Sequence, residues 1–205
     1  MIPVMSESLL ELPALSDRYY RLLSLLCEIY PEKVLKLTGD QLSSFNYSLQ
    51  LAMNAGPTSA AQALDAITEL AEGIDQSKDP DVKNSPELIK FLESLIKPVF
   101  DAALLYSSRA AEIGNGATRA FYAMFKCHDM IASACLQMLT GVVNSVQDEN
   151  YRKQVENGLG MLVSKMKECI AVTCPSRVAK RNMKQHFMKS FDECVAQIAP
   201  IVVVK

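Results

Sequence analysis

Apolar residues recur every three or four positions along most of the chain, which is the spacing of one face of an α-helix. Residues 17–37, DRYYRLLSLLCEIYPEKVLKL, show the pattern most clearly. We expect Ser16 to cap this helix and Pro31 to end it, because the residue before proline disfavours the helical conformation. Its apolar stripe consists of Tyr19, Leu22, Leu23, Leu26 and Ile29.

The same period predicts seven further helices, separated by turn residues. Breaks are expected at Gly56-Pro57, in the polar segment 75–85, at IGNGAT (residues 113–118) and at Pro175-Ser176. Ser85-Pro86 is a typical helix opening, and Pro98 is expected to kink or split the helix that follows. The residues expected in the core are Leu22, Leu23, Leu26, Leu49, Ile67 and Leu92.

About eight apolar-striped helices with short polar connections predict an all-α chain. Two successive helices take roughly 40–45 residues, in the range of HEAT and armadillo units. We therefore expect a HEAT/armadillo-like helical repeat solenoid, an α-α superhelix, with residues 1–205 forming one block of about four helix pairs. A closed helical bundle would satisfy the same stripes and is the structural alternative.

Composition excludes several classes of protein. Hydrophobic residues make up 49% of the 205 residues, too many for a disordered chain. The apolar run at residues 19–30 is interrupted by Arg21 and Glu28, so we expect no membrane span. Residues 1–12 show no secretory signal pattern. The six cysteines have no framework spacing, so we expect reduced, mostly buried thiols in a cytosolic or nuclear protein.

Charge is unevenly distributed although the net charge is only −2. Residues 1–101 carry 15 acidic and 8 basic side chains, whereas residues 152–189 carry 9 basic and 2 acidic ones. One helix face displays Arg177, Lys180, Arg181 and Lys184 at positions i, i+3, i+4 and i+7. This face is the candidate partner-binding site, suited to an acidic protein surface or to phosphates, and the alternative is a solvated face. Nucleic-acid binding is not expected, because no aromatic residues interleave the charges.

No motif supports catalysis, a metal or a cofactor. Zinc would require four ligands at characteristic spacing, but Cys127, His128 and Cys135 have no partner pair, nor does Cys169 with Cys174. Gly158 and Gly160 lie inside a helical pattern and follow no strand, so they indicate close helix packing rather than a phosphate loop. We expect no enzyme, no cofactor and no catalytic or metal-binding residue.

The stretch PVMSESLLELPALSDRYYRLLSLLCEIYPEKVLKL (residues 3–37) resembles the C-terminal region of a nuclear export receptor of the importin-β (karyopherin) family. The likeness rests on Ser-Glu-Ser-Leu-Leu-Glu-Leu-Pro, on Tyr-Tyr-Arg-Leu-Leu and on Cys-Glu-Ile-Tyr-Pro-Glu-Lys. It continues more loosely through GATRAFYAMFKCH to the terminal Val-Lys. It implies stacked HEAT repeats belonging to the C-terminal part of a longer receptor.

The resemblance also implies a function. Exportins of this family bind protein cargo together with the GTP form of the small GTPase Ran and carry it from the nucleus to the cytoplasm. Cargo and Ran-GTP are therefore the expected partners, nucleoporins are a further candidate, and shuttling between nucleus and cytoplasm is the expected localisation. The alternative is a helical-repeat scaffold for protein–protein interaction without any role in nuclear transport.

Overall fold

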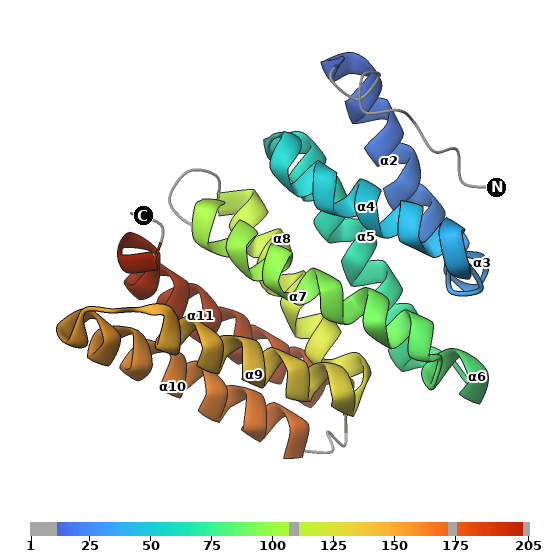
Figure 1. Cartoon of the computed structure of the whole chain (residues 1–205). Coiled ribbons are helices and arrows are strands. Elements are labelled where there is room, and N and C mark those ends of the chain that lie inside the picture. Colours follow the sequence, from blue (N-terminus) through green and yellow to red (C-terminus); the bar gives the residue numbers. More distant parts are fainter. Residues whose placement is uncertain (1–11, 107–110, 172–175, 203–205) are drawn as a thin grey trace.

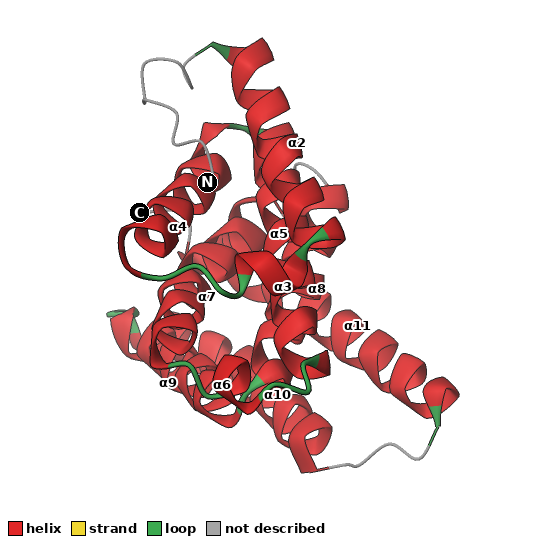
Figure 2. Cartoon of the chain, turned by 90° about the vertical axis from the view of Figure 1, so that its right-hand side faces the viewer, coloured by secondary structure: helices red, strands yellow, loops and turns green. Residues whose placement is uncertain are grey.

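The computed structural model describes residues 12–106, 111–171 and 176–202, and within these ranges the chain forms helices and no strand (Figure 2). Two four-residue helices, α3 (Pro31–Val34) and α6 (Pro80–Lys83), lie in connections. The expectation of an all-α chain with about eight longer helices is confirmed. These longer helices are α2 (Pro13–Ile29), α4 (Gly39–Ala55), α5 (Pro57–Gln76), α7 (Pro86–Tyr106), α8 (Ala111–Cys127), α9 (Asp129–Ser145), α10 (Glu149–Ala171) and α11 (Arg177–Val202).

Several helix boundaries follow directly from local sequence. Proline occupies the first position of α2, α3, α5, α6 and α7, where its missing N–H would have had no helical partner. Helix α7 is capped by Ser85, whose hydroxyl accepts a hydrogen bond from the Leu88 N–H at 3.4 Å. Helix α4 ends at Gly56, which has a φ of 148° that side-chain-bearing residues rarely adopt. The predicted break at Gly56-Pro57 and the predicted helix opening at Ser85-Pro86 are therefore confirmed.

The long helices pack in two layers. Helices α2, α5, α8 and α11 lie side by side in one layer, and α4, α7 and α9 form the other. The chain passes between the layers as it advances from α4 to α9, so that α4 packs on α5 and α7 packs on α8. Helix α10 packs on α9 and α11. The first and last helices, α2 and α11, lie at opposite ends of the molecule (Figure 1).

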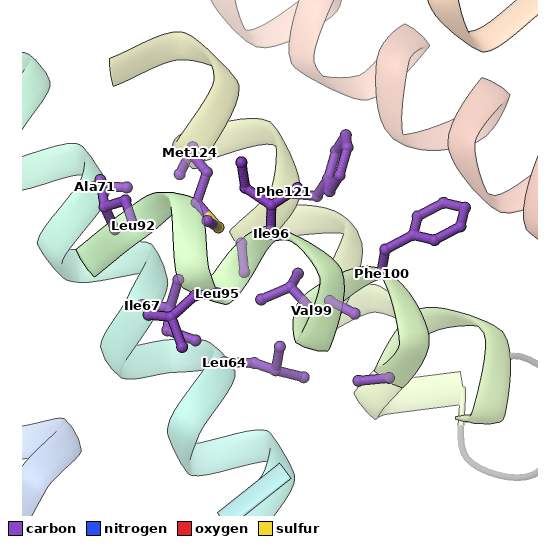
Figure 3. Close-up of a cluster of buried hydrophobic side chains, with 14 of the residues drawn as sticks. Leu64, Ile67, Ala71, Leu92, Leu95, Ile96, Val99, Phe100, Phe121 and Met124 are labelled. Carbon is purple, nitrogen blue, oxygen red and sulfur yellow. The ribbon is translucent and has the colours of Figure 1, made fainter. Parts of the chain in front are cut away.

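The core lies between the two layers. In its centre, apolar side chains of α5, α7 and α8 meet, among them Leu64, Leu95 and Phe121 (Figure 3). Toward α11 the core becomes aromatic: the Phe121 and Phe191 ring centroids are 5.1 Å apart, and those of Phe125 and Phe187 are 4.9 Å apart. Burial of so much apolar surface is the main stabilising contribution to the fold.

The predicted burial is confirmed for Leu23, Leu49, Ile67 and Leu92 but not for the other two core residues. Leu22 is 44% exposed and Leu26 is half-buried. Ile29, assigned to the same stripe, is 58% exposed. The buried face of α2 consists of Ser16, Tyr19, Tyr20, Leu23 and Cys27.

Helix α2 packs mainly on α5, and the side that bears Tyr19, Tyr20 and Leu23 is the one in contact, so Leu22 faces outward. Two polar contacts accompany this orientation. The Tyr19 hydroxyl lies 3.0 Å from the Ser48 hydroxyl of α4, and the Ser16 hydroxyl lies 3.5 Å from that of Ser59 in α5. Ser16 is consequently not the helix cap, because α2 already begins at Pro13.

The expected helix break at residues 113–118 is wrong. The segment IGNGAT lies inside α8, where Gly116 faces Leu64 of α5, and a Cβ added there would be in ordinary van der Waals contact, 3.6 Å from Leu64 Cδ1. The Thr118 hydroxyl also donates a hydrogen bond of 2.7 Å to Asp192 of α11. These tertiary contacts offset the cost of about 1 kcal/mol that each glycine brings to a helix relative to alanine.

Pro98 does not split α7, which is continuous from Pro86 to Tyr106. Proline removes one backbone hydrogen bond, but Leu95, Ile96, Val99 and Phe100 on either side of it are buried, and their packing holds the helix together.

The polar segment 75–85, which was expected to be a loop, contains helical residues. Helix α5 extends to Gln76 and the short α6 follows it.

Candidate functional site

The predicted basic face lies at the beginning of α11. Arg177, Lys180 and Arg181 are exposed, whereas Lys184 is half-buried against α5 and α8. The first turns of α11 extend beyond the neighbouring helices (Figure 2). No residue of α11 before Phe187 is buried, so this part of the helix is held mainly by its continuation into the packed half.

Three of these four basic residues line a groove of about 320 Å³ between α5, α8 and α11, which we call the basic groove. Arg177 is the exception, because it precedes the groove by one helical turn. The lining residues are Glu72, Asp75 and Gln76 of α5, Tyr122, Ala123 and Lys126 of α8, and Lys180, Arg181, Met183 and Lys184 of α11.

Lys184 links the three helices that form the groove. Its ammonium lies 3.1 Å from the Glu72 carboxylate of α5 and 5.7 Å from the centre of the Tyr122 ring of α8. Lys126 also has a partner, since it donates a 2.8 Å hydrogen bond to the Cys169 carbonyl near the end of α10. Both lysines therefore contribute to the walls of the groove.

Lys180 and Arg181 differ from these two lysines. Neither forms an ion pair with any carboxylate in the part of the chain that the structure describes. They lie at the amino end of α11, where the helix dipole is positive and where added positive charge is unfavourable. Their positive charges are therefore available to an anionic group from outside the chain.

The α5 side of the groove is acidic, because Glu72 and Asp75 line it. Asp65 and Glu69 precede them along α5, and no basic residue lies in the last turn of this helix to complement the negative end of its dipole. Partial burial, followed by the nearby Glu72, Glu28 and Asp65 carboxylates, raises the pKa of Glu69 above its ordinary value. Arg119 of α8 partly compensates this charge by pairing with Asp65 at 2.8 Å.

The thiols show no sign of nucleophilic activation. Five of the six cysteines are described, and all five are buried, while Cys174 lies outside the described residues. Burial raises the pKa of Cys27, Cys127 and Cys194 to about 12, so these thiols are protonated at neutral pH. A thiolate is the reactive form of cysteine, so none of the three is poised as a nucleophile.

The neighbouring Cys127 and His128 do not form a dyad. The Cys127 thiol donates to the Met124 carbonyl at 3.0 Å, and the His128 Nδ1 caps α9 by accepting from the Met130 N–H at 3.1 Å. Among the described residues, no group of three or more histidine, cysteine, aspartate and glutamate side chains could hold a metal ion.

Sequence reasoning identified the basic face of α11 but missed most of the groove. The acidic residues of α5 have a visible spacing, since Asp65, Glu69 and Glu72 occur at i, i+4 and i+7. The positions of Tyr122 and Lys126 beside them depend on α8 lying between α5 and α11. Nothing in the local pattern of any of these helices indicates that arrangement.

The sequence matches no model of a known protein family, and no solved structure matches the chain. Within the described ranges, each helix is too short or too polar to cross a membrane.

Proposed function

We propose that this chain is a helical-repeat block of a nuclear export receptor, which binds protein cargo together with the GTP form of Ran. The observation that carries the proposal is the stepwise packing of the helices in two layers, with α2 and α11 at opposite ends. An array in which each unit contacts only its neighbours presents an extended surface for protein partners. The resemblance of residues 3–37 to export receptors of the importin-β family is the reason for proposing nuclear export in particular.

The basic groove is the surface on which we expect a protein partner to bind. Arg177, Lys180, Arg181 and Lys184 provide positive charge at one end of a chain whose first half is acidic. Exposed charges of this kind mainly determine the rate of association and its salt dependence. In the transport hypothesis, the acidic first half contacts basic cargo and the beginning of α11 contacts an acidic protein surface.

The test is a capture experiment in which the nucleotide state of Ran is the variable. The immobilised chain is incubated with nuclear extract and with Ran loaded either with a non-hydrolysable GTP analogue or with GDP. Retained proteins are then quantified by mass spectrometry. We expect Ran and a defined set of cargo proteins to be retained with the GTP analogue and to be lost with GDP.

A set of retained proteins that is the same in both nucleotide states would contradict the transport role. That result would favour the alternative, a helical-repeat scaffold unrelated to nuclear traffic. In the transport case we also expect a tagged chain to move between nucleus and cytoplasm, with nucleoporins among its transient contacts.

A further inference from the structure

We propose that the basic groove holds an acidic segment of a protein partner that also carries a bulky apolar side chain. The carboxylates of the segment lie beside Lys180 and Arg181, and its apolar side chain lies on Tyr122 and Met183. This inference shares one premise with the proposed function, namely that the groove binds a protein. It adds the chemistry of the segment that the groove accepts.

Charge at the α11 wall selects for acidic groups. Lys180 and Arg181 are exposed and lie next to each other in the groove, and neither pairs with a described carboxylate. The only basic residue of α11 in the groove that has such a partner is Lys184, at 3.1 Å from Glu72. A carboxylate from a partner therefore meets two unpaired cations and the positive end of a helix dipole.

The floor of the groove selects for an apolar group. Tyr122 and Met183 are half-buried and Ala123 is buried, so an apolar surface lies beneath the charged rim. Methionine adapts to partners of different shape, and tyrosine offers a large and rigid contact area. A free phosphate ion would leave this floor in contact with water, whereas a leucine or phenylalanine side chain would cover it.

The acidic wall disfavours a continuous polyanion. Glu72 and Asp75 of α5 also line the groove, on the other side of α8 from the helix that carries Lys180 and Arg181. A nucleic acid carries regularly spaced phosphates and would bring several of them close to these carboxylates. A protein segment can place acidic residues at the α11 wall and apolar or basic residues at the α5 wall, which matches the groove on both sides.

The experiment begins with a phage-displayed library of random dodecapeptides selected on the full chain. We expect enriched peptides in which a bulky apolar residue is flanked by aspartate or glutamate. A fluorescein-labelled synthetic copy of the most enriched peptide is then titrated with the chain by fluorescence anisotropy. Replacing the apolar residue of that peptide by alanine tests the floor without altering the protein.

The protein variants test the basic wall. K180E/R181E should lower the affinity of the chain for the peptide by at least about tenfold at low salt, because two attractive contacts become repulsive. The matched control, K36E/K167E, changes the net charge equally at two exposed lysines outside the groove and should leave the affinity within about twofold. Circular dichroism should show the same helix content for both variants, because all four side chains are exposed.

Three results would overturn the proposal. The first is a selection in which no peptides combining acidic and bulky apolar residues are enriched. The second is an equal loss of peptide affinity in both double variants. The third is an affinity for heparin that equals the affinity for the peptide and falls equally in K180E/R181E. Failure of the transport role is distinguishable, because peptide binding is measured without Ran. If the peptide binds as expected but the proteins captured by the chain are the same with Ran-GTP and Ran-GDP, this inference stands and the proposed function is rejected.

Discussion

Helices α5 and α11 lie in the same layer but differ in how much of each is buried. Ten of the twenty residues of α5 are buried, because α2 and α8 flank it and α4 packs over it. Only five of the twenty-six residues of α11 are buried, and all of them lie from Phe187 onward. Their exposed faces differ as well, since that of α5 is acidic and the beginning of α11 is basic.

This difference separates stability from binding. The buried contacts of α5 join it to α2, α4, α7 and α8, so that changes in its core affect the whole molecule. The first turns of α11 contribute little to the core, so that their charges can vary with little effect on folding. The predictions that follow test this separation, beginning with the largest expected effect.

The largest effect is expected in the core of α5. Leu64 is fully buried against α8, so Leu64→Ala should lower the free energy of unfolding by about 2–5 kcal/mol. In α11, Val178 is 68% exposed, and Val178→Ala should change the free energy of unfolding by no more than about 0.5 kcal/mol. Urea unfolding of both variants measures the difference. Similar values for the two variants would contradict the separation.

The packed half of α11 provides the second test, through two glycines of α10. An added Cβ at Gly158 would lie 3.2 Å from Ile198 Cγ2, whereas one at Gly160 would meet nothing within 4 Å. Gly158→Leu should therefore destabilise the protein by about 1–3 kcal/mol through overpacking. Gly160→Ala should stabilise it by up to about 1 kcal/mol, because alanine favours the helix. The Tm of thermal unfolding should therefore fall in Gly158→Leu and rise in Gly160→Ala. A shift of both Tm values in the same direction would show that α10 and α11 are not closely packed at Gly158.

The third test concerns the acidic face of α5. Because the pKa of Glu69 is raised in the folded protein, the folded state binds its proton more tightly than the unfolded state does. The charged carboxylate therefore lowers stability at neutral pH, and this penalty disappears as the pH falls through the raised pKa toward the ordinary value. We expect Glu69→Gln to be more stable than the wild type at pH 7 and to lose this advantage on acidification.

Urea unfolding at several pH values measures this effect. Glu156→Gln, at an exposed position of α10, is the matched control for removal of one negative charge. A gain from Glu69→Gln that is independent of pH, or equal to that of Glu156→Gln, would show that burial and the neighbouring carboxylates do not raise the pKa of Glu69 as described.

The smallest effect is expected where the two helices meet. Glu72 and Lys184 are 38% and 32% exposed, so their ion pair is partly screened by solvent. A double-mutant cycle with Glu72→Ala and Lys184→Ala should give a coupling energy of no more than about 1 kcal/mol. Added salt should reduce it further. A much larger coupling would mean that this pair is a main support of α11, in conflict with the separation of roles.

Local features of the sequence predicted most of the helices. The helix-capping serine at Ser85 with Pro86, and the glycine at Gly56, act within a few residues of themselves and behaved as expected. The stripe containing Leu49 also has only one possible buried face, because polar residues separate its apolar positions. In such segments, the chain has no competing local solution, and tertiary contacts do not alter the outcome.

Where two local solutions have similar energies, the tertiary structure decided between them. Leucines occur around much of α2, and the packing of its Tyr19, Tyr20 and Leu23 side on α5 left Leu22 facing outward. The glycines of IGNGAT disfavour a helix, but the packing of α8 on α5 and the hydrogen bond from Thr118 to Asp192 retained it.

The groove illustrates the same division. The sequence alone determined that α11 begins with four basic residues on one face and that α5 carries a row of carboxylates. Only the tertiary structure decided that Tyr122 and Lys126 lie between them and that Arg177 does not reach the groove. Periodicity determines which side of a helix is apolar or charged, whereas the position of that side relative to other helices depends on packing between segments far apart in the chain.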